Sequence, residues 1–163
     1  MMAAGLTGAY LHPIPNFEPL TLTVFCSGVL LGTRDGALVG GLTMLVYSLL
    51  NPYGAVHPLV LAAQVAGEAL AGAAGGVCAR LGVPGRGPVA RAVVLAVCGL
   101  ALTVVFDLIT NVATGLVYGQ LRATLLGGIP FALLHLATNV ATFAAVGTPL
   151  VAVFARYRER LSS

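Results

Sequence analysis

The chain consists of long apolar runs that are interrupted at intervals by short clusters of glycine, proline and polar residues. Leucine, valine and alanine follow one another along these runs without the strict alternation of a half-buried β-strand. Runs of this kind predict helices, and runs of about 20 residues predict helices that cross a membrane. The predicted segments are residues 17–33, 36–50, 58–80, 89–118 and 123–155.

Composition supports a membrane protein. Hydrophobic residues make up 58% of the chain and charged residues 8%, and the mean hydropathy is +0.98. Soluble domains carry about 25% charged residues, so this chain has too few to cover a water-facing surface. The 21 glycines favour close packing between helices. We therefore predict an all-α bundle in the lipid bilayer, with residues 1–163 forming a single domain of a multi-pass protein of the cell membrane.

An apolar stub, residues 1–11, precedes the first predicted segment. It is shorter than a span, so it is either the end of a helix that starts upstream or a half-inserted helix. It lacks the basic region of a signal peptide. Counting the stub, the pattern predicts about six transmembrane helices, of which the first is short.

The arginines orient this predicted bundle. With six helices, the second loop, the fourth loop and the C-terminal segment share one side of the membrane, whereas only Arg122 lies in the other loops. The positive-inside rule then places both termini in the cytoplasm. The net charge of +3 is too small to predict nucleic-acid binding. The arginines on the shared side are Arg34, Arg80, Arg86, Arg91, Arg156, Arg158 and Arg160.

Three ionisable residues fall deep within the predicted spans, namely Glu68, Asp107 and His135. Each lies about ten residues from the outer end of its helix, or about 15 Å below the outer surface. An isolated charge in the membrane costs about 2.5–3.5 kcal/mol, so these side chains should face the bundle interior and serve a function. Each has an amide one helical turn away. These amides are Gln64, Asn111 and Asn139.

Polar and aromatic residues of the outer loops would form the rim above these three side chains. Together they predict an outward-open cavity with acids at its floor. The alternative is a purely structural role, in which polar side chains only join neighbouring helices at about 0.6 kcal/mol each. The predicted rim residues are Asn16, Phe17, Asn51, Tyr53, His57 and Tyr118.

Motifs of several membrane enzymes and metal sites are missing from the sequence. It contains no GxSxG, no HExxH and no P-loop, so we expect no catalytic site and no ATP hydrolysis by this chain. Two carboxylates and an imidazole would suit a transition metal, but no single helix carries a chelating pair, and no metal or cofactor is predicted. Cys26, Cys78 and Cys98 lie in or beside apolar runs and are interpreted as small buried residues.

Four stretches resemble the substrate-binding S component of an energy-coupling factor (ECF) transporter. The resemblance covers most of the chain and implies a high-affinity binding subunit for a vitamin or vitamin precursor. It also implies partners, namely a transmembrane coupling subunit and two cytoplasmic ATPases, which use the ATP. The stretches are "PNFEP" at 15–19, "GVLLGTRDGALVGGLTMLVYSLLNPYG" at 28–54, "FDLITNVATGL" at 106–116 and "GIPFALLHLATN" at 128–139.

The resemblance also implies roles for the N-terminal part of the chain. Ala4 and Gly8 are similar to the small-residue face through which such proteins dock on the coupling subunit. Glu18 lies at the mouth of the predicted cavity, beside the loop that carries Asn51. Its carboxylate either accepts hydrogen bonds from the ligand or anchors the first loop.

The predicted site favours a ligand that is rich in N–H donors or mildly cationic. A pyrimidine, a thiamine precursor and a corrinoid building block all satisfy this description, and the sequence does not choose among them. A second function class is a small non-transport membrane scaffold in cell-envelope assembly, which needs no converging acids. A third is a membrane enzyme that uses Asp107 and His135.

Overall fold

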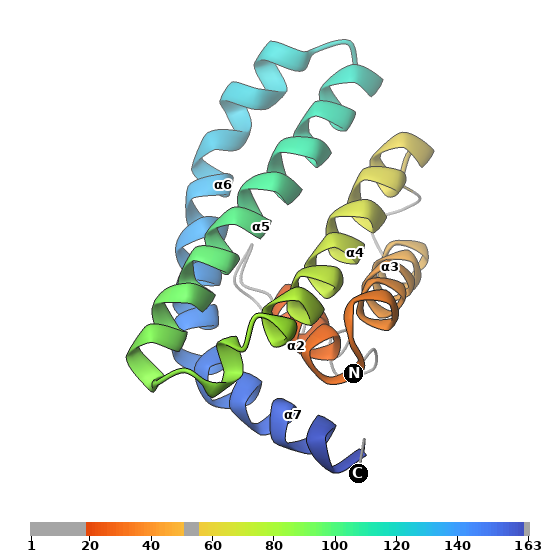
Figure 1. Cartoon of the computed structure of the whole chain (residues 1–163). Coiled ribbons are helices and arrows are strands. Elements are labelled where there is room, and N and C mark those ends of the chain that lie inside the picture. Colours follow the sequence, from red (N-terminus) through yellow and green to blue (C-terminus); the bar gives the residue numbers. More distant parts are fainter. Residues whose placement is uncertain (1–18, 51–55, 162–163) are drawn as a thin grey trace.

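The computed structural model describes residues 19–50 and 56–161, which are helical apart from short connections (Figure 1). No β-strand occurs in these ranges, so the all-α prediction is confirmed for them. The elements are α2 (Leu20–Leu31), α3 (Thr33–Leu49), α4 (Pro58–Arg80), the 3₁₀ turn η1 (Val83–Gly85), α5 (Pro88–Val117), α6 (Leu121–Thr142), the π-helical turn η2 (Phe143–Gly147) and α7 (Thr148–Leu161).

Three helical stretches of the described residues are long and apolar enough to cross a membrane. They are α4, α5 and the stretch Leu121–Arg158. Helices α2 and α3 have 12 and 17 residues, or about 18 and 26 Å, against a hydrocarbon core of about 30 Å. The predicted count of about six spans and the cytoplasmic placement of both termini therefore remain predictions.

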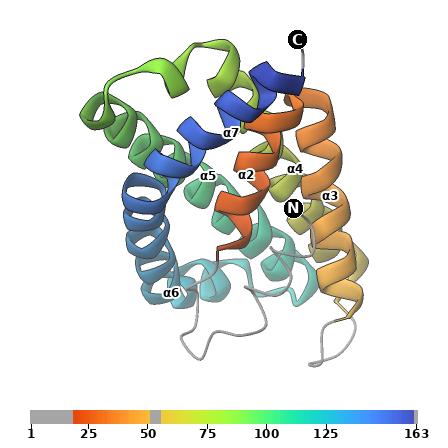
Figure 2. The same cartoon turned by 90° about the horizontal axis from the view of Figure 1, so that it is seen from below.

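The last predicted segment, 123–155, is bent and divides between two α-helices. Helix α6 passes into the π-helical turn η2, and α7 then runs across the end of the bundle (Figures 1 and 2). Pro149 lies at the second residue of α7 and has no N–H to continue the α-helical hydrogen bonds of the preceding turn. A π turn next to a proline is a known cause of a bend. The predicted segment 123–155 therefore comprises most of α6, the turn η2 and part of α7.

Helices α2, α3 and α4 form a glycine-packed unit. A Cβ atom at Gly28 or Gly36 would collide with the carbonyl oxygen of Gly72, and one at Gly75 would collide with the carbonyl oxygen of Phe25. The three backbones are therefore in direct contact, as the glycine content predicted. The turn between α2 and α3 is the single residue Gly32, whose φ of 97° favours glycine.

Helices α5 and α6 form an antiparallel hairpin beside the glycine-packed unit (Figure 1). The main contact between the two groups is that of α5 with α4. The apolar core lies near the end of the bundle where α7 crosses. There the rings of Phe25 and Phe143 meet edge to face, with centroids 5.2 Å apart. Leu95 and Val151 are also fully buried in this core. The core joins α2, α5, η2 and α7.

The end of the bundle crossed by α7 also gathers arginines. Arg158 of α7 donates to the carbonyl oxygen of Val29 at 3.5 Å, and Arg91 of α5 donates to that of Thr148 at 3.0 Å. Arg34 and Arg80 lie at the ends of α3 and α4 that face the same way. This grouping matches the pattern from which the orientation was predicted, although which side of a membrane it faces remains a prediction.

Candidate functional site in the bundle interior

An acid and an imidazole meet between α5 and α6, as predicted from their depth. His135 Nδ1 lies 2.8 Å from Asp107 Oδ1, and the two side chains are 10% and 17% exposed. Their contact is a hydrogen bond when the neutral imidazole carries its proton on Nδ1, and an ion pair when the imidazole is protonated on both nitrogens. The second carboxylate oxygen, Asp107 Oδ2, is buried and has no hydrogen-bond partner among the described residues.

The third predicted ionisable residue, Glu68, is fully buried on α4. Thr21 of α2 donates from its hydroxyl to Glu68 Oε1 at 2.8 Å. Thr21 was not among the predicted site residues. A hydroxyl on an apolar helix is too common a feature to have identified it from the sequence.

Phe106 connects these two groups. A Cβ at Gly67 would lie 2.5 Å from the Phe106 ring, so the ring packs directly on the backbone of α4, next to Glu68. The same ring meets His135 edge to face at 6.2 Å between centroids. The Phe106 ring thus contacts the residue that precedes Glu68 on α4 and the imidazole of His135 on α6, whereas one cavity that holds all three ionisable groups stays a prediction.

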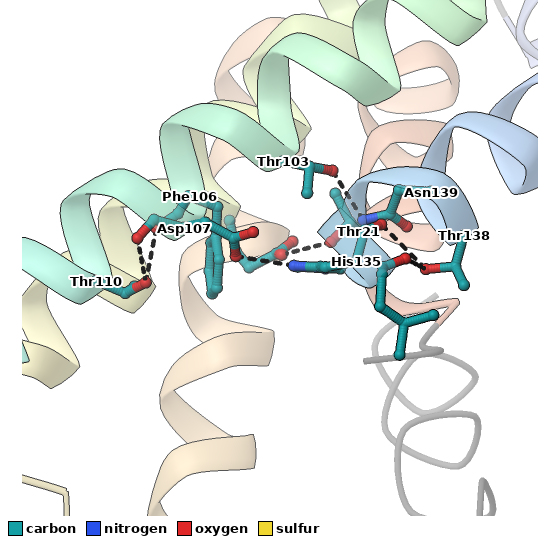
Figure 3. A network of polar contacts seen from close by, with 10 residues as sticks. Thr21, Thr103, Phe106, Asp107, Thr110, His135, Thr138 and Asn139 are labelled. Atoms are coloured by element: carbon teal, nitrogen blue, oxygen red, sulfur yellow. Dashed lines mark hydrogen bonds and ion pairs between the residues drawn. The ribbon is translucent and has the colours of Figure 1, made fainter. Parts of the chain in front are cut away.

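A second polar contact joins α5 and α6 one helical turn from the acid–imidazole pair (Figure 3). Asn139 is almost fully buried, and its side-chain amide donates to the hydroxyl of Thr103 at 2.9 Å. On the other side of the pair, Asn111 packs against Gly128, where an added Cβ would lie 3.0 Å from its amide nitrogen. The Asp107–His135 and Thr103–Asn139 contacts are thus two rungs about one turn apart, whereas Gly128 lies about two turns from His135 along α6.

The predicted residue Gln64 takes part in a different contact. Ser48 of α3 donates from its hydroxyl to Gln64 Oε1 at 3.2 Å, which links α3 to α4. Gln64 is thus occupied at least in part by a bond within the glycine-packed unit. Ser48 is a further residue that the sequence did not single out.

A cavity of about 450 Å³ opens between α4 and α5, but its chemistry differs from the predicted one. All its lining residues are apolar, and none of the predicted site residues is among them. Leu108 and Val112 follow Asp107 and Asn111 directly in the sequence, so the cavity lies on an adjacent face of α5. The lining residues are Leu59, Ala62, Ala63, Leu108, Ile109, Val112, Ala113 and Leu116.

Several predicted residues lie outside the described part of the chain. They would form the rim of the site and the docking face for a coupling subunit, so both features remain predictions. Within residues 19–50 and 56–161, no group of three or more His, Cys, Asp or Glu residues could hold a metal ion. The undescribed site residues are Ala4, Gly8, Asn16, Glu18, Asn51 and Tyr53.

The chain matches no known family model, no curated protein and no solved structure.

Proposed function

We propose that this chain is the membrane-embedded substrate-binding subunit of an uptake transporter of the ECF type. It would take up a small polar molecule, a vitamin or vitamin precursor, from the outer side of the cell membrane. A transmembrane coupling subunit and two ATPases would then drive release inside. The proposal assigns no catalytic step and no cofactor to this chain.

The observation that carries the proposal is the free oxygen of a buried carboxylate. Asp107 Oδ2 is buried without a partner among the described residues, while Asp107 Oδ1 is held by His135. A buried acceptor that makes no hydrogen bond costs about 1–3 kcal/mol. A ligand with an N–H donor or a positive charge would satisfy this oxygen and stack near the ring of Phe106. This is the same ligand chemistry that the sequence favours.

The remaining polar residues would then support the site rather than contact the ligand. Glu68 is fully buried and bonded to Thr21, and Asn139 is bonded to Thr103. Asn111, on the same face of α5 as Asp107 and one turn along, is only partly buried and can supply a second polar contact. The ligand-contacting set is thus narrower than the predicted one.

The test begins with purification of the chain in mild detergent and mass spectrometry of small molecules that co-purify. We expect one bound species in the wild-type protein. Asp107→Asn should weaken its binding by about 10–100-fold, because a hydrogen bond to a charged group contributes about 1.5–3 kcal/mol. Asp35→Asn is the matched control, since Asp35 is an exposed acid in the first turn of α3.

Two results would contradict this proposal. One is a wild-type protein that binds no small molecule, and the other is an Asp107→Asn variant with the same occupancy as Asp35→Asn. A scaffold in cell-envelope assembly is the second candidate. It is favoured by two hydrogen bonds within the protein, one between Glu68 and Thr21 and one between Asn139 and Thr103. A scaffold would co-purify with a membrane protein and would not depend on Asp107.

A further inference from the structure

Two cysteine side chains face each other across the contact between the two helical groups. The sulfur atoms of Cys78 on α4 and Cys98 on α5 are 3.6 Å apart. Both thiols are free, and Cys98 is the more exposed of the two. The third cysteine, Cys26, is buried on α2 and serves as an internal reference.

The backbones that carry these thiols are fixed on both sides. Three residues before Cys78, Gly75 packs directly on the carbonyl of Phe25 in α2. Directly after Cys98, Gly99 packs on the ring of Phe143, where an added Cβ would lie 2.9 Å from the nearest ring carbon. Neither helix can shift far, so the proximity of the two sulfurs is a property of the packing.

We propose that Cys78 and Cys98 form a reversible disulfide that covalently joins the glycine-packed unit to the α5–α6 hairpin. An S–S bond is about 2.05 Å long, so the sulfurs need to approach by about 1.6 Å from their separation of 3.6 Å. Because both helices are fixed by their packing, the proposal requires that rotation of the two side chains about χ1 supply this movement.

The bond would form with a two-electron oxidant, of which hydrogen peroxide is the probe. The Cys98 thiol, as the more exposed one, attacks one peroxide oxygen and becomes a sulfenic acid, and the first water leaves. The Cys78 thiol then attacks the sulfenic sulfur, the S–S bond forms, and the second water leaves. Two thiols lose two hydrogens and two electrons, and peroxide is reduced to two waters. An added dithiol reverses the reaction by exchange.

The test uses the full-length protein in detergent, treated with hydrogen peroxide and then unfolded in the presence of a maleimide. Wild-type protein should lose two of its three reactive thiols, remain a monomer and recover both thiols with dithiothreitol. The Cys26→Ser variant should still lose two thiols, whereas Cys78→Ser and Cys98→Ser should form no intramolecular disulfide. The oxidised wild-type protein should also unfold at a midpoint several degrees higher.

Retention of all three thiols in the oxidised wild-type protein would overturn the proposal. So would a disulfide between two copies of the chain, or a loss of both remaining thiols in Cys78→Ser, because loss of Cys98 alone is the sulfenic acid expected without its partner. These readouts do not depend on a bound small molecule, so they are independent of the proposed transport function.

Discussion

The helices of the glycine-packed unit pack backbone against backbone, whereas those of the α5–α6 hairpin pack through side chains. In the unit, side chains are missing where helices cross, and the backbone of Gly72 touches both Gly28 and Gly36. In the hairpin, the helices are held apart by side chains that pair across the gap. Asp107 with His135 and Thr103 with Asn139 are two such pairs, spaced by one helical turn.

This difference indicates where a ligand could bind. Backbones in direct contact leave no space and cannot change partners. Polar side chains in a hairpin can replace a hydrogen bond to each other with one to a ligand. Asp107 Oδ2 is an acceptor that has no hydrogen-bond partner among the described residues. For the proposed binding function we therefore expect the ligand to contact the hairpin, with the glycine-packed unit as its rigid support.

The largest effect is expected from filling one of the glycine contacts. Gly72→Ala would drive a Cβ into the backbone carbonyl of Gly36, and we expect a loss of about 3 kcal/mol in the free energy of unfolding. The midpoint of thermal unfolding in detergent measures this loss. Gly127→Ala in α6 is the matched control, because the space around Gly127 is open. There alanine should add about 0.5–1 kcal/mol. Equal midpoints for the two variants would remove the contrast between the regions.

The next effect concerns the contact between α2 and α4. Thr21→Val keeps the shape of the side chain but removes the donor to the buried carboxylate of Glu68. A hydrogen bond to a charged group contributes about 1.5–3 kcal/mol, so we expect unfolding to become easier by about 2 kcal/mol. Thr23→Val is the control on the same helix, because the Thr23 hydroxyl bonds to the carbonyl of Pro19 within its own turn. A similar loss in both variants would indicate a general effect of valine.

A double-mutant cycle measures the acid–imidazole pair of the hairpin. Asp107→Asn and His135→Phe, singly and together, should give a coupling of about 1 kcal/mol, within the range found between residues in contact. Chemical unfolding of the four proteins in detergent supplies the free energies. The same cycle between Asp35 and His135 should give no coupling, because Asp35 lies in the first turn of α3. A coupling of zero for Asp107 and His135 would mean that the hairpin is not held by this pair.

The smallest effect is expected at the second rung of the hairpin. Thr103→Val removes the hydroxyl that accepts from Asn139, and interhelical hydrogen bonds within membranes contribute about 0.6 kcal/mol on average. The unfolding midpoint should therefore fall slightly. Thr114→Val on the same helix is the control, since its hydroxyl bonds to the carbonyl of Thr110. A fall of more than about 2 kcal/mol in the free energy of unfolding would show that the hairpin resembles the glycine-packed unit in rigidity.

Which parts of the chain are helical could be predicted from the sequence alone. Apolar runs between glycine and proline breaks predicted α4 and α5 to within a residue of their ends, because the burial of backbone groups in an apolar medium requires a helix. The sorting of arginines and the supply of glycines were also visible in the sequence. The depth argument correctly brought Asp107 to His135, since counting residues along a helix gives distance along its axis.

Which side chains meet across the helix interfaces could not be predicted from the sequence and follows from how the helices pack. Each residue turns a helix by about 100°, so a small rotation of one helix changes every partner across an interface, and the sequence does not state that rotation. This is why Thr21 and Ser48 emerged as partners of Glu68 and Gln64 only in the structure. The apolar lining of the cavity, the bend at η2 and the 3.6 Å approach of Cys78 to Cys98 have the same origin. Helix formation is local along the chain, whereas helix packing depends on how several helices fit at once.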